Sequence, residues 1–208
     1  MSQYFRIHPE NPQLRLIRQA ADIIRGGGVI VYPTDSSYAL GCQIGDKNAL
    51  TRIRQIRRLQ PKHNFTLVCK DLSELATYAR VDNSAFRLVK SCTPGAYTFI
   101  LPATREVPRR LVHPRKKTIG IRVPDNPICQ TLLDELGEPI MSTTLILPGE
   151  EYPLSDPDEI HDMLQHQVDL IVDGGYGGLE ITTMISLETG SPQVLREGLG
   201  DIAPFVID

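Results

Sequence analysis

The sequence predicts an α/β fold in which helices are layered on one sheet. Two observations predict it: helical patterns alternate with short β-branched runs along the whole chain, and no internal repeat or low-complexity tract interrupts them. A hydrophobic content of 41% with 23% charged residues is ordinary for a protein that buries a sizeable core. We therefore expect residues 1–208 to form a single domain.

The elements follow from local patterns. Apolar residues recur at helical spacing over residues 12–25, and three glycines end that helix before the β-branched run at 29–31. Further helices are expected to begin after the N-cap aspartates Asp46, Asp71 and Asp82. The Asp46 helix is expected to run to about Arg58. Strands are expected at 66–69, 98–101, 118–123, 140–145, 169–172, 183–187 and 193–195, and helices near 127–136 and 157–166.

Composition argues against several classes of protein. No basic segment followed by an apolar one opens the chain, and no apolar run approaches the ~18 residues that span a bilayer, so a cytoplasmic protein with no membrane partner is expected. The four cysteines lie in apolar stretches without a CxxC pair, which is typical of reduced core residues. His161 and His166 do not share a helical face, and no protein-bound metal is expected.

Charge is distributed unevenly along the chain. Residues 1–133 hold 21 lysines and arginines against 9 acidic residues, whereas residues 134–208 hold 1 against 16. Either the two halves neutralise each other within the fold, or the basic half binds a polyanion.

The segment at 32–41, YPTDSSYALG, directly follows the strand at 29–31. Open α/β sheets form ligand crevices at strand ends, and this segment offers several hydroxyl groups and a carboxylate there. The alternative is a tight turn with no ligand.

Two basic segments are candidates for phosphate binding. Between Asp46 and Asp71 there is no acidic residue, and positions 54, 57, 58 and 62 would fall near one stripe of a helix. Residues 105–122 hold seven lysines and arginines against Glu106, on the longest segment without periodicity. Because aromatic residues do not interleave with these cations, structured RNA fits better than single-stranded bases. The candidate RNA contacts are Arg58, Lys62, Arg109, Arg110, Arg115, Lys116 and Lys117.

The glycine run at 174–178 matches neither a Rossmann nor a P-loop pattern, and it is interpreted as a turn or a close backbone approach.

Taken in order, four motifs resemble the YrdC-like family of threonylcarbamoyl-adenylate synthases. They are PTDSSYALG at 33–41 (family pattern PTDTVYGLG), PGAYT at 94–98 (PGPxT), GIRVPD at 120–125 and LREG at 195–198 (LRxG). The resemblance runs from about residue 12 to residue 200.

This resemblance implies a twisted mixed parallel and antiparallel sheet with flanking helices and a basic concave cavity. In that cavity L-threonine, bicarbonate and ATP, with or without Mg2+, would form threonylcarbamoyl-AMP, which is used to modify adenosine 37 of tRNA. Such chemistry depends on positioning and on cations more than on acid or base groups. By carry-over, Thr34, Tyr38 and Thr98 would line the threonine pocket. The nucleotide or pyrophosphate would be held by Arg57, Arg122, Ser142, Thr144, Thr183 and Arg196.

The sequence departs from the family pattern at two places. The KxR pair aligns with residues 57–59, so that Leu59 replaces a cation, and the SxN pair aligns with residues 142–144, so that Thr144 replaces Asn. Three functions stay open: a weak or altered synthase, a binding protein for double-stranded RNA or tRNA without efficient synthase activity, and an adenylating enzyme for another carbamate or acid.

Overall fold

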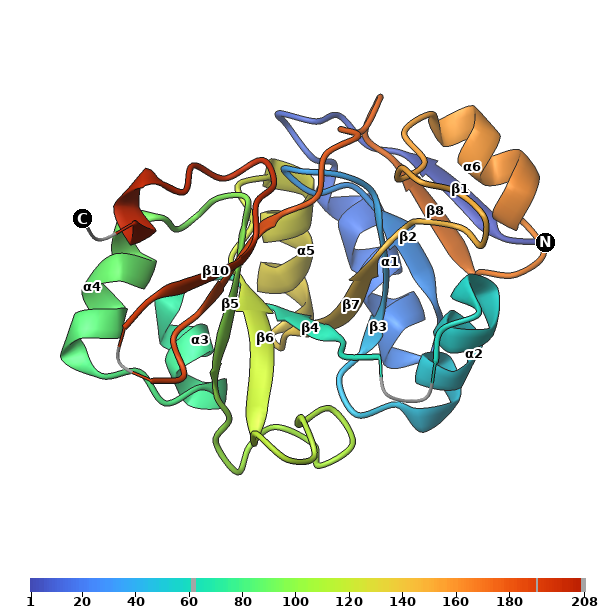
Figure 1. The fold of residues 1–208 in the computed structure, drawn as a ribbon. Helices are drawn as coiled ribbons and strands as arrows, with labels where there is room; N and C mark the ends of the chain where they lie inside the picture. Colours follow the sequence, from blue (N-terminus) through green and yellow to red (C-terminus); the bar gives the residue numbers. More distant parts are fainter. Residues whose placement is uncertain (61–62, 190, 207–208) are drawn as a thin grey trace.

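The described strands form one mixed sheet. The computed structural model describes residues 1–60, 63–189 and 191–206. Their ten strands lie in the order β1-β8-β2-β3-β7-β4-β6-β5-β9-β10 (Figure 1). The strands are β1 (Gln3–Arg6), β2 (Ile30–Tyr32), β3 (Ala39–Gln43), β4 (Thr66–Val68), β5 (Tyr97–Pro102), β6 (Thr118–Arg122), β7 (Ile140–Thr144), β8 (Leu170–Asp173), β9 (Thr183–Ser186) and β10 (Gln193–Arg196).

The sheet contains both parallel and antiparallel pairs of strands. β8 pairs in parallel with both β1 and β2, and the pairs β4 with β6 and β5 with β9 are also parallel. The remaining neighbours are antiparallel. The expectation of a mixed sheet with flanking helices is confirmed.

Helices cover both faces of the sheet. They are α1 (Leu14–Arg25), α2 (Lys47–Arg57), α3 (Leu72–Tyr78), α4 (Asn83–Ser91), α5 (Pro127–Leu136) and α6 (Pro157–Leu164), with a short 3₁₀ turn at Ala203–Phe205. α1 and α5 bury apolar residues such as Ile24 and Leu132 in one cluster with Ile30 of β2. The other four helices contribute to a second cluster, which contains Ile53 and Leu75. Helix layers on both faces explain why most strands are apolar without alternation.

The N-caps predicted from sequence are present. The carboxylate of Asp46 accepts hydrogen bonds from the Asn48 and Ala49 amides, and Asp82 caps α4 in the same way. Asp71 caps α3, but Glu74 accepts from the amide of Lys70, one residue before the cap, so the capping-box pattern is shifted by one position. The four cysteines are buried as free thiols, as expected.

The sequence patterns do not predict β1 or β3. β1 is a partly exposed strand at the edge of the sheet without an apolar run. β3 lies between β2 and β7 and is buried on both faces, so it has no alternation either. Gly41 is needed there because a Cβ atom at this position would lie 2.7 Å from the Tyr32 ring and 2.6 Å from the Ile140 side chain.

None of the helices in the described part of the chain is long and apolar enough to cross a membrane.

We predict that Asp46→Ala lowers the free energy of unfolding by about 1 kcal/mol, because two amides at the start of α2 lose their acceptor. Asp46→Asn keeps an acceptor oxygen and is the matched control, which should retain most of the stability. Urea unfolding measures both variants, and equal losses in the two would contradict the capping role.

Candidate anion-binding cavity

A cavity opens on the sheet where β7, β4 and β6 lie side by side. Its volume is about 180 Å³, and it widens to about 740 Å³ when its open mouth is included. The side chains that line it come from α2, from seven strands (β3, β4, β5, β6, β7, β9 and β10) and from the loops next to them. They are Ser37, Ala39, Arg57, His63, Asn64, Thr66, Val68, Thr98, Arg122, Ser142, Thr143, Thr144, Ile146, Ile181, Thr182, Met184 and Arg196.

The cavity brings together six of the residues proposed from sequence as substrate or nucleotide contacts. These six are Arg57, Thr98, Arg122, Ser142, Thr144 and Arg196. They come from four separate strands and one helix, so only the folded sheet places them at one point. Thr34, Tyr38 and Thr183 lie outside this lining.

Thr34 and Tyr38 make hydrogen bonds within the protein. The Thr34 hydroxyl accepts from the amides of Ser36 and Ser37 and donates to the Ser37 carbonyl oxygen at 2.6 Å, which shapes the turn between β2 and β3. The Tyr38 hydroxyl accepts from the Gly174 amide and donates to the Gly175 carbonyl oxygen at 2.7 Å. These contacts position the turn beside the cavity.

The glycine run at 174–178 packs closely on that turn. A Cβ atom at Gly178 would lie 2.0 Å from the Ser36 carbonyl oxygen. The glycines are therefore a close backbone approach, which was one of the two interpretations of their sequence.

Thr183 faces away from the cavity. Its hydroxyl donates to the Gly200 carbonyl oxygen at 2.5 Å and accepts from the Gly198 amide at 2.9 Å. The neighbouring Thr182 lines the cavity instead, because successive residues of an extended chain point to opposite sides.

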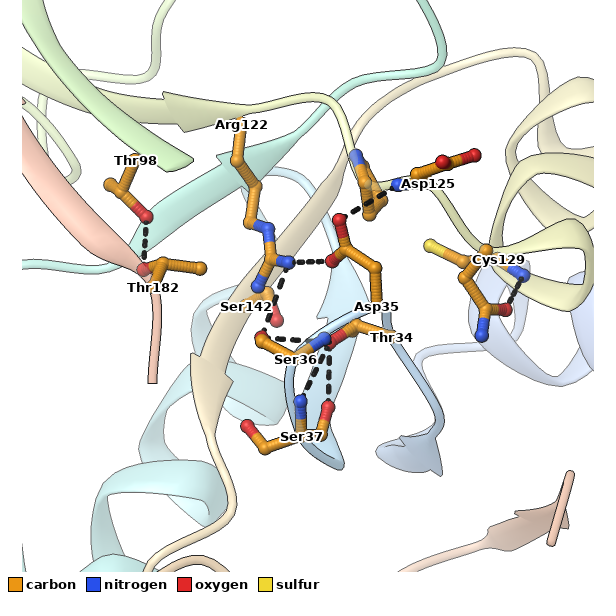
Figure 2. A network of polar contacts seen from close by, with 12 residues as sticks. Thr34, Asp35, Ser36, Ser37, Thr98, Arg122, Asp125, Cys129, Ser142 and Thr182 are labelled. Atoms are coloured by element: carbon orange, nitrogen blue, oxygen red, sulfur yellow. Dashed lines mark hydrogen bonds and ion pairs between the residues drawn. The ribbon is translucent and has the colours of Figure 1, made fainter. Parts of the chain in front are cut away.

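Arg122 is held by a buried carboxylate. Figure 2 shows its guanidinium group pointing at Asp35, with which it forms an ion pair, and at the Ser36 hydroxyl at 3.3 Å. The second oxygen of Asp35 accepts from the Asp125 amide at 2.9 Å. Arg122 Nε is buried and has no acceptor among the described residues. The ion pair thus fixes the guanidinium group and leaves one buried donor unused.

Arg57 and Arg196 are anchored by backbone carbonyl groups. Arg57 Nε donates to the Ile146 carbonyl oxygen at 2.7 Å and Nη1 donates to the Thr143 hydroxyl at 2.8 Å. Arg196 donates twice to the Thr182 carbonyl oxygen, at 3.1 and 2.8 Å. Burial lowers the pKa of both guanidinium groups, which shows that their charge is partly desolvated. An anion in the cavity would offset that cost.

A chain of hydrogen bonds connects Arg196 with two threonine hydroxyl groups in the cavity. Arg196 donates to the Thr182 hydroxyl at 3.2 Å, and the Thr182 and Thr98 hydroxyl oxygens are 2.8 Å apart (Figure 2). Arginine can only donate, and one of the two threonine hydrogens bridges the pair, so the hydrogen of the other hydroxyl is left to donate further. The Thr98 and Thr182 pair is therefore suited to bind an acceptor atom of a ligand.

Ser142 has less capacity to donate. Its hydroxyl accepts from Tyr32 at 2.7 Å and donates to the Leu40 carbonyl oxygen at 3.1 Å. A ligand could use only the remaining lone pair of the Ser142 oxygen, unless the hydrogen bond to the Leu40 carbonyl oxygen is broken.

Leu59 belongs to the core. It is partly buried against the larger apolar cluster, and its amide donates to the Arg54 carbonyl oxygen at 2.9 Å, just after the end of α2. It does not line the cavity.

The single stripe of cations expected on α2 is wrong, because α2 ends at Arg57. Arg58 terminates the helix in the left-handed region (φ 49°), while Arg57 turns into the cavity. Arg52 forms an ion pair with Asp169 at 2.7 Å. Lys62, the last member of the proposed stripe, lies outside the described residues.

The basic segment between β5 and β6 is an anchored loop. Val107 and Leu111 are buried, whereas Arg109, Arg110, Arg115, Lys116 and Lys117 are exposed. Lys116 forms an ion pair with Glu188 at 3.2 Å. Arg109 and Arg110 line a second hollow of about 270 Å³ that shares His63 and Asn64 with the cavity. The loop therefore presents its cations next to the mouth of the cavity.

Sequence reasoning missed several residues of the cavity. Thr143 and Thr182 each stand next to a residue that was singled out. The alternation of side chains could have identified Thr182 from Thr183, whereas Thr143 lies between Ser142 and Thr144, which line the cavity as well. His63 and Asn64 lie in the loop before β4, and their position in the sequence does not place them at the cavity.

Sequence comparison assigns the chain to known relatives. Residues 22–198 match the Sua5/YciO/YrdC family model, which is described as "Telomere recombination". The chain is 64% identical to the uncharacterized protein YciO of Escherichia coli (strain K12), over 99% of this chain and 100% of YciO. It is 29% identical to a threonylcarbamoyl-AMP synthase of Vibrio vulnificus (strain YJ016), over 88% of this chain and 98% of the synthase.

Solved structures agree with this assignment. The crystal structure of E. coli YciO superposes with a TM-score of 0.95, over 99% of this chain and 100% of YciO. Sua5 of P. abyssi complexed with L-threonine superposes with a TM-score of 0.86 at 26% identity, over 95% of this chain and 58% of Sua5. The chain therefore belongs to the Sua5/YciO/YrdC family.

Proposed function

We propose that the cavity binds the phosphate groups of ATP and that the protein is a weak threonylcarbamoyl-AMP synthase. The observation that carries the proposal is the convergence of Arg57, Arg122 and Arg196 in one cavity whose described lining contains no acidic residue. Two of these guanidinium groups, those of Arg57 and Arg196, are partly desolvated, and they donate to backbone carbonyl and threonine hydroxyl oxygens. Guanidinium groups held in this way stabilise the charge of a phosphoryl group in transfer.

Two relatives support L-threonine as the substrate. A threonylcarbamoyl-AMP synthase is 29% identical over 88% of this chain, and a solved structure of Sua5 is described as complexed with L-threonine. The amine of threonine would take up carbon dioxide as a carbamate, and the carbamate oxygen would attack the α-phosphorus of ATP. Pyrophosphate would leave with the bond electrons. ATP is the substrate here, and any Mg2+ would enter on its phosphates.

Each polar residue of the cavity would have its own role in binding the reactants. Thr98, which shares one hydrogen bond with Thr182, would bind a carboxylate or carbamate oxygen, in line with its assignment to the threonine pocket. Arg122 Nε would donate to a phosphate or carbamate oxygen beside it. Arg57 and Arg196, on opposite sides of the cavity lining, would hold the phosphate chain and the leaving pyrophosphate. Fixing the reactants in this way supplies much of the rate acceleration that such a reaction needs.

A second candidate function is binding of structured RNA, either tRNA or double-stranded RNA. It is favoured by the exposed cations of the loop between β5 and β6, which is held in place by buried Val107 and Leu111. Such a loop would contact the phosphate backbone rather than bases.

The first prediction concerns pyrophosphate. The wild-type protein should release pyrophosphate from ATP only when both L-threonine and bicarbonate are present, at a slow rate. Arg196→Ala should lower that rate by about a hundredfold, because one desolvated cation contributes roughly 3 kcal/mol to such a transition state. The control is Arg87→Ala, on the exposed side of α4. Release that is independent of threonine would contradict the proposed substrate.

The second prediction concerns the replaced asparagine. Thr144→Asn should raise the rate of pyrophosphate release by about tenfold, since it restores an amide donor worth roughly 1.4 kcal/mol at the cavity wall. Leu59→Arg should instead lower stability, because Leu59 packs on the core. A higher rate in Leu59→Arg with an unchanged melting temperature would show that the structural account of Leu59 is incorrect.

The third prediction tests RNA binding. The affinity for a double-stranded RNA should fall steeply with salt, and Arg109→Ala with Arg110→Ala should reduce the slope of log affinity against log salt by about 1 to 2. The matched double variant is Arg87→Ala with Lys90→Ala, two exposed cations on α4. Filter binding at several salt concentrations measures all three proteins. An equal reduction in both double variants would mean that binding follows net charge and not this loop.

A further inference from the structure

His63 lies at the wall between the cavity and the hollow beside the basic loop. It lines both spaces. Its Nε2 atom is 3.2 Å from the Thr143 hydroxyl oxygen, and its ring meets the Phe65 ring edge to face with 5.4 Å between centroids. These two contacts fix the orientation of the imidazole ring.

A hydrogen-bond chain through Thr143 links this ring to Arg57. Arg57 Nη1 donates to the Thr143 hydroxyl oxygen at 2.8 Å. Arginine cannot accept, so the Thr143 hydrogen points either to His63 Nε2 or to another acceptor in the cavity, because the Thr143 oxygen has two lone pairs. Where the hydrogen points to Nε2, His63 is neutral with its proton on Nδ1.

The charges that face His63 all oppose its protonation. The charged side chains that line the two spaces are Arg54, Arg57, Arg109, Arg110, Arg122 and Arg196, and within the described part of the chain no carboxylate lines either one. Burial, and then Arg57 and Arg54, lower the pKa of His63 below its usual value. A bound anion would reverse this balance, because it would stand between the arginines and the ring.

We propose that His63 Nε2 accepts from Thr143 when no anion is bound, and that His63 is a positioning residue that takes up one proton when an anion binds in the cavity. The proton comes from solvent and goes to Nε2, so His63 changes from an acceptor to a donor toward Thr143. The Thr143 oxygen then accepts from both Arg57 and His63, and its own hydrogen is released to donate to the anion. This inference rests on the proposed anion site, but not on the identity of the substrate.

Nuclear magnetic resonance titration of the histidine rings tests the proposal with sulfate as the probe. Sulfate stays a dianion from about pH 8 to about pH 5, the range in which histidine titrates, so any pH dependence of its binding comes from the protein. Saturating sulfate should raise the pKa of His63 by about one unit. By linkage, sulfate should bind about tenfold more tightly at the low end of this range than at the high end.

Variants separate the role of His63 from a general effect of charge. In His63→Gln the sulfate affinity should not change with pH, whereas the matched control His166→Gln, at an exposed position, should behave as wild type. Thr143→Val should lose the tighter binding at low pH, and Thr143→Ser should restore it. Melting temperatures and spectra establish that each variant is folded.

The outcomes distinguish this proposal from the proposed function. Sulfate binding that strengthens equally at low pH in His63→Gln and in wild type would overturn the role of His63 alone. Failure of both sulfate and ATP to bind at any pH would overturn the anion site, and the proposed function with it.

Discussion

The cavity depends on the ion pair between Arg122 and Asp35. Asp35 lies in the turn between β2 and β3, Arg122 ends β6, and the second carboxylate oxygen holds the amide of Asp125 just before α5. Both side chains are only 9% exposed, so loss of either partner would leave a buried charge without its counterion. The free-energy cost of such a charge is larger than the stability that an exposed ion pair contributes. Asp35 thus joins the turn after β2 to the distant segment that runs from β6 to α5, and it sets the position of the central guanidinium group.

Around that pair the site is built from cations and neutral hydroxyl groups. Arg57 and Arg196 are each anchored by a carbonyl oxygen and by a threonine hydroxyl. Neutral acceptors orient a guanidinium group without cancelling its charge, whereas a carboxylate would compete with an anionic ligand. Thr143 and Thr182 therefore have similar roles in one cavity, because each accepts from an arginine and shares a hydrogen bond with one further group, His63 or Thr98.

The uneven charge of the chain has a partial explanation in internal ion pairs. Acidic residues of the second half meet basic residues of the first in Arg6 with Asp173, Arg52 with Asp169, and Lys116 with Glu188. These pairs neutralise part of the basic half within the fold. Arg109 and Arg110 stay exposed beside the second hollow, so a polyanion partner also remains compatible with the structure.

The sequence by itself determined the local elements and the chemical character of the site. N-cap aspartates and apolar periodicity located the helices, and the motifs resembling the synthase family pointed to Arg57, Arg122 and Arg196. Only the tertiary structure decided which side chains face the cavity. Thr183 and Thr182 are neighbours with opposite orientations, β3 has no sequence signal because both its faces are buried, and His63 meets Thr143 only because β4 pairs with β7. Such relations are set by strand order and register, which a local pattern cannot encode.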